Sequence, residues 1–137
     1  MPTLIVLGFL ALIIPALWLH ARSNVRLANR HMAGRPALTP AEFGDHYFPP
    51  DQAHIAAKLR ELLAAEIVVD LARLHPDDRP VQDLRIDELD SLALAEVMMD
   101  AEREFHIKLP DGRLRDIRTF RELVELIADE SKRAGTA

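Results

Sequence analysis

The sequence contains no cysteine, so disulfide bonds, thiolate nucleophiles, cysteine-ligated zinc and iron–sulfur clusters are all excluded. Its six histidines are scattered along the chain, and no two of them have the spacing of a metal site on a helix. We therefore predict no metal site. Serine is also scarce, occurring only at positions 23, 91 and 131, which leaves few candidates for a modified hydroxyl group.

Charged residues are absent from the first 21 positions, MPTLIVLGFLALIIPALWLHA. A helix of that length spans about 31 Å, close to the thickness of the hydrocarbon layer of a bilayer. Two alternatives are a cleaved signal peptide and the core helix of a soluble fold. Because the basic residues follow the apolar segment instead of preceding it, we predict a single transmembrane helix at residues 1–21.

Positive charge is concentrated directly after this segment, at Arg22, Arg26, Arg30 and Arg35, and every acidic residue comes later in the chain. By the positive-inside rule, the C-terminal domain is expected in the cytoplasm, with the helix in the cell inner membrane. After Arg35 the chain carries 13 basic residues against 22 acidic ones. An acidic surface of this kind excludes nucleic acid as a partner and suits basic protein partners.

Residues 22–50 have weak periodicity and several prolines and glycines, which predicts a partly ordered linker that is first basic and then rich in proline and aromatic residues. Residues 25–31 could continue the membrane helix. Thr39 and Glu42 form the pattern of a capping box, with proline at the first helical position. The aromatic residues that follow either pack on the domain or rest at the membrane interface: Phe43, Tyr47 and Phe48.

Residues 51–131 are expected to form an all-α domain, because apolar residues recur at helical spacing and no segment alternates as a strand does. We predict helices at 51–74, at 91–105 and from Thr119, a single turn at 114–117, and a disordered tail at 132–137. The loop at 76–89 should place four apolar side chains in the core: Val81, Leu84, Ile86 and Leu89. The second helix should face inward with six residues: Leu92, Ala95, Met98, Met99, Ala101 and Phe105.

Ser91 stands at the predicted start of this second helix, between Asp90 and Leu92. A hydroxyl group there lies where free backbone N–H groups and the helix dipole favour an attached phosphate. The alternative is that Asp90 and Ser91 merely cap the helix. A hydrolase is not expected, because His106 would be separated from Ser91 by the length of the helix, more than about 20 Å.

Several motifs occur together between about residues 55 and 130: Asp90-Ser91-Leu92, Glu96, the segment from Phe105 to Asp111, and Ile117-Arg118-Thr119-Phe120 with Leu123-Val124. With these motifs the chain resembles the acyl carrier protein family. The resemblance implies an acyl-carrier-like four-helix bundle of three main helices and a short one. It also implies 4'-phosphopantetheine attached to Ser91, flanked by Asp90 and Leu92, whose thiol carries acyl groups as thioesters.

The resemblance further implies the partners. They are a phosphopantetheinyl transferase and the acyl-loading and acyl-using enzymes of lipid or secondary-metabolite synthesis, whose basic patches would dock on four acidic residues of the second helix: Glu96, Asp100, Glu102 and Glu104. The protein is thus expected to be a carrier and not an enzyme. Many family members have a Leu-Gly pair before the serine motif, whereas residues 83–89 here contain no glycine. The alternative is therefore a carrier-like adaptor or regulatory subunit of a membrane complex that has no arm.

Overall fold

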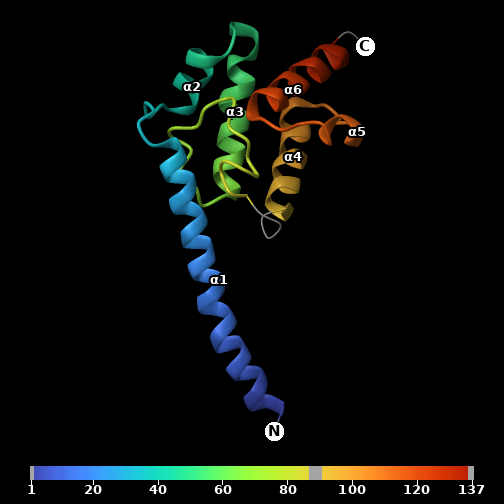
Figure 1. The fold of residues 1–137 in the computed structure, drawn as a ribbon. Coiled ribbons are helices and arrows are strands. Elements are labelled where there is room, and N and C mark those ends of the chain that lie inside the picture. Colours follow the sequence, from blue (N-terminus) through green and yellow to red (C-terminus); the bar gives the residue numbers. More distant parts are fainter. Residues whose placement is uncertain (1, 87–90, 136–137) are drawn as a thin grey trace.

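The computed structural model describes residues 2–86 and 91–135, and within these ranges it contains helices and no strand. The helices, in chain order, are α1 (Pro2–Met32), α2 (Pro40–Tyr47), α3 (Pro50–Glu66), α4 (Ser91–Phe105), α5 (Asp111–Leu114) and α6 (Phe120–Gly135). Figure 1 shows α1 projecting from a bundle formed by the other helices. The predicted fold, an all-α bundle preceded by a long apolar helix, is confirmed.

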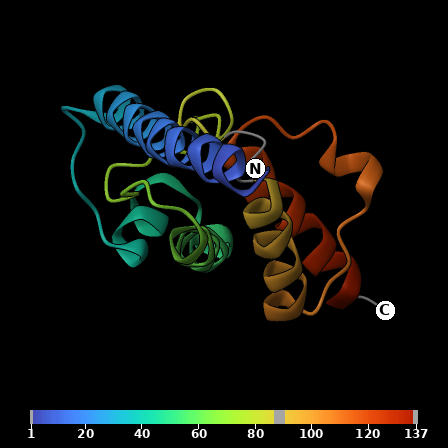
Figure 2. The ribbon, with the colours of Figure 1, turned by 90° about the horizontal axis from the view of Figure 1, so that it is seen from below.

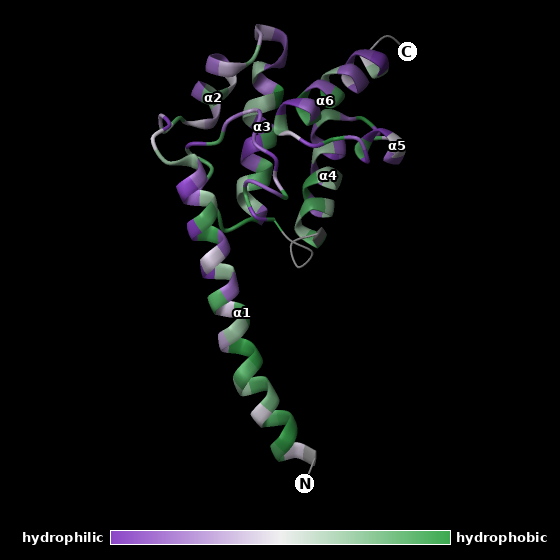
Figure 3. Cartoon of the chain, viewed as in Figure 1, coloured by the Kyte–Doolittle hydropathy of each residue, from purple (hydrophilic) through white to green (hydrophobic). Residues whose placement is uncertain are grey.

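Helix α1 is continuous from the uncharged segment to Met32, so the first part of the predicted linker is helical, and the helical continuation at 25–31 is confirmed. The N-terminal part of α1 is apolar and solvent-exposed along its length (Figure 3), and the helix is long and apolar enough to cross a membrane. Its last turns differ, because Ala28 and Met32 are fully buried in the core of the bundle. Helix α1 is therefore joined to the domain by packing.

Helix α2 begins with the predicted capping box. The Thr39 hydroxyl accepts a hydrogen bond from the Glu42 N–H at 3.2 Å, and the Glu42 carboxylate accepts one from the Thr39 N–H at 2.8 Å. The hydrogen bond that the Thr39 N–H donates to the carboxylate is the main cause that lowers the pKa of Glu42. The box satisfies backbone donors that the first turn of a helix otherwise leaves without partners.

The aromatic residues of α2 pack on the domain, which decides between the two positions that the sequence left open. Phe43 and Phe48 are buried, and the Phe43 ring lies 5.4 Å from the ring of Phe120 in α6 and 5.5 Å from that of Tyr47, centroid to centroid. The prediction of a partly ordered linker up to residue 50 is therefore wrong for α2. This short helix belongs to the folded bundle because its aromatic face completes the core.

Gly44 allows α2 to lie close against α3. A Cβ atom at this position would overlap the backbone carbonyl of Ala53, which cannot move like a flexible side chain. We predict that Gly44→Ala lowers the free energy of unfolding by about 1 to 3 kcal/mol, as overpacked cores do. Urea unfolding of the full chain in detergent, followed by circular dichroism, measures this. Gly112→Ala is the matched control, since a Cβ there meets no atom within 4 Å. Equal stability of the two variants would contradict the prediction.

Helix α3 packs against α2 on one side and against α4 and α6 on the other (Figure 2). It ends at Glu66, so the prediction that it continues to Leu74 is wrong. The β-branched residues Ile67, Val68 and Val69 follow, with Ile67 in an extended conformation, and the Asp70 carboxylate then accepts a hydrogen bond from the Ala72 N–H at 2.9 Å. The apolar pattern still predicts burial correctly at two later positions, because the irregular segment places both side chains in the core: Leu71 and Leu74.

The loop after this segment places Leu84 and Ile86 in the core, as expected, whereas Leu89 lies outside the described residues. Val81 is 62% exposed, so its predicted burial is wrong. It lies at the outer side of a turn in which the Asp83 carboxylate accepts hydrogen bonds from the Arg79 backbone and side chain.

Helix α4 follows the predicted bounds, but its buried face is rotated from the predicted one. Val97 and Ala101 are its buried residues, with Leu94, Met98 and Phe105 partly buried. Three residues expected inside are exposed: Leu92, Ala95 and Met99. The side of α4 that packs against α3 therefore consists of residues 94, 97, 98, 101 and 105, and this spacing places them on a single face of a helix.

The C-terminal part is mostly as predicted. Helix α4 ends where His106 adopts a left-handed conformation (φ 53°) and the Ile107 N–H bonds to the Glu102 carbonyl at 3.0 Å, a Schellman arrangement. The single turn lies at α5, immediately after Pro110, and not at 114–117. Helix α6 begins after Thr119, whose hydroxyl caps the Glu122 N–H at 3.2 Å, and continues to Gly135. Residues 132–135 are thus helical and not a disordered tail.

Candidate functional site

Ser91 is the first residue of α4, a helix of 15 residues, while Asp90 lies outside the described residues. The backbone N–H groups of a helix's first turn lack partners within the helix and attract an anion. No acidic residue lies in the first turn of α4, and Leu92 beside the serine is 72% exposed. This end of the helix therefore fits an attached phosphodiester, which would be approachable from solvent.

The four acidic residues predicted to dock partners differ in their surroundings. Glu96 is exposed and has no charged partner within the described residues. Asp100 is paired with Arg103, and Glu104 lies 3.9 Å from the Lys58 ammonium in α3. The Glu102 carboxylate accepts a hydrogen bond from the Leu109 N–H at 2.9 Å, which holds the segment after α4. Glu102 therefore stabilises the fold, and of the four acidic residues Glu96 is the one most available to a partner protein.

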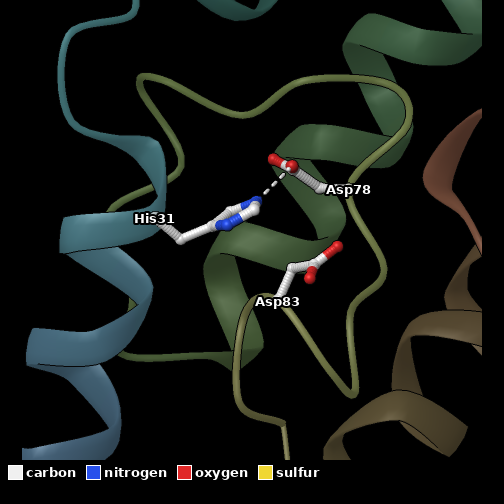
Figure 4. Close-up of side chains that lie close together, drawn as sticks. All are labelled: His31, Asp78 and Asp83. Carbon is white, nitrogen blue, oxygen red and sulfur yellow. Dashed lines mark hydrogen bonds and ion pairs between the residues drawn. The ribbon is translucent and has the colours of Figure 1, made fainter.

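A second group of charged residues connects α1 to the loop that leads to Ser91. We call His31, Arg35 and Asp78 the Asp78 junction. The buried Asp78 carboxylate accepts two hydrogen bonds from the Arg35 guanidinium, at 2.6 and 3.0 Å, and lies 3.0 Å from the His31 ring nitrogen (Figure 4). It also accepts the His75 N–H at 2.9 Å. The sequence analysis did not predict this junction, because Arg35 and Asp78 are 43 residues apart and belong to no common motif.

The charges of the junction stabilise each other. Burial raises the pKa of the Asp78 carboxyl, but the hydrogen bonds from Arg35, His75 and His31 outweigh it, so the pKa lies below its usual value. The hydrogen bond to Asp78 raises the pKa of Arg35 in return. His31, Asp78 and Asp83 have potential metal-ligand atoms within 4.8 Å of one another (Figure 4). Because the Arg35 guanidinium already supplies the positive charge beside the Asp78 carboxylate, we interpret this cluster as an ion pair and not as a metal site.

A serine at the first position of a helix in a small all-α bundle fits the class of covalent carriers, in which a hydroxyl group holds a phosphate-linked cofactor. Comparison with known proteins agrees with this class. Residues 57–127 match the family described as "Phosphopantetheine attachment site". This match covers more than half of the chain and includes part of α3, the whole segment between α3 and α4, then α4, α5 and the first part of α6.

Individual relatives are all named "Acyl carrier protein". The one from Aster yellows witches'-broom phytoplasma is 33% identical over 70 residues, which are 51% of this chain and 88% of the relative. The one from Solidesulfovibrio magneticus is 32% identical over 73 residues, which are 53% of this chain and 90% of the relative. The one from Thermosynechococcus vestitus is 29% identical over 77 residues, which are 56% of this chain and 91% of the relative.

The chain therefore belongs to the acyl carrier protein family. Family membership identifies the cofactor as covalently attached 4'-phosphopantetheine and the general partners as a phosphopantetheinyl transferase and acyl-handling enzymes. The relatives match about half of this chain, and the match begins inside α3. Helices α1 and α2, with His31 and Arg35 of the Asp78 junction, thus lie outside the shared region, whereas Asp78 lies inside it.

Proposed function

We propose that the protein is a membrane-anchored acyl carrier that holds acyl intermediates as thioesters on a 4'-phosphopantetheine arm at Ser91, for lipid or secondary-metabolite synthesis. The observation that carries this proposal is the position of Ser91, at the first residue of α4 and inside the matched region. Of the chain's serines, Ser23 and Ser131 lie outside that region.

The chain's own residues have simple tasks in this function. Ser91 provides the hydroxyl oxygen that bonds to the arm, and the free backbone N–H groups of the first turn of α4 hold the negatively charged phosphate. When bound, the group supplies a terminal thiol that carries the acyl chain. Glu96, with Asp100 and Glu104 nearby, provides negative charge for fast and weak docking of basic partner enzymes. Asp90 and Leu92 are proposed to frame the attachment site for the transferase.

The membrane part of the proposal rests on α1. Its uncharged segment, residues 1–21, is proposed to cross the inner membrane once, with Arg22, Arg26 and Arg30 after it holding the carrier domain in the cytoplasm. The bundle of α2 to α6 then forms the carrier domain, and the last turns of α1 join it to the anchor. Anchoring raises the local concentration of the carrier near membrane enzymes.

The second candidate function is a carrier-like adaptor or regulatory subunit of a membrane complex, without the arm. It is favoured by residues 83–89, which contain no glycine where many family members have a Leu-Gly pair. The two functions differ in one covalent bond, so a mass measurement separates them.

The test is the intact mass of the full chain after coexpression with a broad-specificity phosphopantetheinyl transferase. We expect a gain of one phosphopantetheinyl group in the wild type, no gain in Ser91→Ala, and an unchanged gain in the control Ser131→Ala. An unmodified wild-type chain would refute the carrier function and favour the adaptor. A gain that persists in Ser91→Ala would instead place the arm on another residue.

A further inference from the structure

The position of Ser91 relative to the anchor follows from how α1 packs. The buried residues Ala28 and Met32 hold the last turns of α1 on the bundle, and the Asp78 junction closes the contact after the helix ends. Helix α1 leads from the uncharged segment into this contact without a break. The direction in which α1 leaves the domain is thereby fixed, and the bilayer position of α1 sets the orientation of the bundle.

The surface that α1 covers is the segment leading to Ser91. A cavity between them is lined on α1 by residues from Leu17 to Val25 and on the domain by Ile67, Val68, Val69, Leu84, Arg85 and Ile86. Arg85 and Ile86 therefore lie beside the part of α1, from Leu17 to Val25, in which the uncharged segment ends at Ala21. This part of α1 is expected at the boundary between hydrocarbon and headgroups.

Ser91 follows Ile86 by five residues. Five residues span at most about 17 Å when fully extended, so Ser91 is confined to the same end of the domain. Figure 1 agrees, since the N-terminal end of α4 lies on the side of the bundle from which α1 projects. Two apolar side chains at this end are strongly exposed: Val68 (89%) and Leu92 (72%).

We propose that this end of the domain, with Val68, Arg85 and Leu92, rests on the lipid surface, so that Ser91 presents its arm at the membrane interface. The inference rests on the proposed function, because it requires α1 to be inserted. Because the chain after Arg35 is acidic overall, packing against α1 and not electrostatic attraction to anionic headgroups holds the surface contact.

The position of the arm at the interface bears on which acyl chains the protein carries and on which enzymes use them. An acyl chain on an arm at the interface can bury its CH₂ groups in the lipid, and this burial becomes more favourable as the chain lengthens. The carrier is therefore suited to long acyl chains and to enzymes whose active sites open at the membrane surface.

Because the chain has no cysteine, single cysteines can be introduced for labelling. Leu92→Cys and Val68→Cys probe the proposed contact, and Lys132→Cys in α6, 69% exposed, is the matched control at the opposite end of the bundle (Figure 1). All are made with Ser91→Ala, so that no arm thiol competes for the label. Each full-length variant carries a fluorophore and is reconstituted in phosphatidylcholine vesicles that contain lipids with a nitroxide quencher at a shallow acyl position.

We expect the labels at 68 and 92 to be quenched severalfold more strongly than the label at 132. Equal quenching at the three positions would overturn the inference. A fourth label, at Leu10→Cys in the uncharged segment, is measured with a deep acyl quencher and reports the anchor separately. If Leu10 is quenched while 68 and 92 match 132, the anchor stands and only the interface contact fails. If Leu10 is not quenched, the membrane part of the proposed function fails.

Discussion

Phe43→Ala is expected to lower the free energy of unfolding by about 3 to 5 kcal/mol, the cost of removing a fully buried phenylalanine side chain. Phe43 has no exposed surface and its ring contacts the rings of Tyr47, Phe48 and Phe120 in edge-to-face or tilted arrangements. The substitution leaves a cavity between α2 and α6 that rigid neighbours fill only in part. Urea unfolding of the full chain in detergent micelles, followed by circular dichroism, measures the change.

Val81→Ala is the control for this prediction, because Val81 is apolar but largely exposed. We expect it to change the stability by less than about 0.5 kcal/mol. A similarly small effect of Phe43→Ala would show that α2 is not part of the cooperative unit, and the sequence-based assignment of residues 22–50 to a linker would then be right for this helix.

The pattern of residues predicted the bounds of α4 and the start of α6 well because both carry local signals. Apolar residues at helical spacing identify α4, and the Thr119 cap marks the start of α6. The same reasoning failed for α3 beyond Glu66. Leu71 and Leu74 continue the helical spacing and are buried in the core, but the segment that carries them is irregular. Periodicity reports which residues are buried and does not by itself report the backbone that buries them.

The candidate site, too, could be predicted from the sequence only in part. The position of Ser91 at a helix start could be predicted, because a short motif and the helix pattern lie next to each other in the sequence. The contact between α1 and the loop could not, because Arg35 and Asp78 are 43 residues apart and neither lies in a recognisable motif. Charge counting treated Arg35 as one of four membrane-flanking arginines, whereas the structure pairs it with a buried carboxylate.

Asp78→Asn is expected to lower the free energy of unfolding by about 2 to 3 kcal/mol, the value of hydrogen bonds to a charged group that is buried. The amide retains the shape of the carboxylate but loses the charge that pairs with Arg35. It also leaves the guanidinium, which is partly buried, without its counter-charge. Asp77→Asn is the control, because Asp77 is exposed and its ion pair with Arg121 should contribute less than about 1 kcal/mol.

The pH dependence tests the electrostatic origin of this effect. The pKa of Asp78 is lower in the folded protein than the value of about 3.9 expected for the unfolded chain. Its stabilising contribution is therefore complete above that value and is lost as the pH falls through the folded pKa. In urea unfolding at a series of pH values, the difference between wild type and Asp78→Asn should be constant from pH about 6 to about 5 and should shrink below pH about 4. A difference that stays constant into acid would mean that the substitution acts through packing, and the ion pair that joins α1 to the carrier domain would then contribute little to holding Ser91 in place.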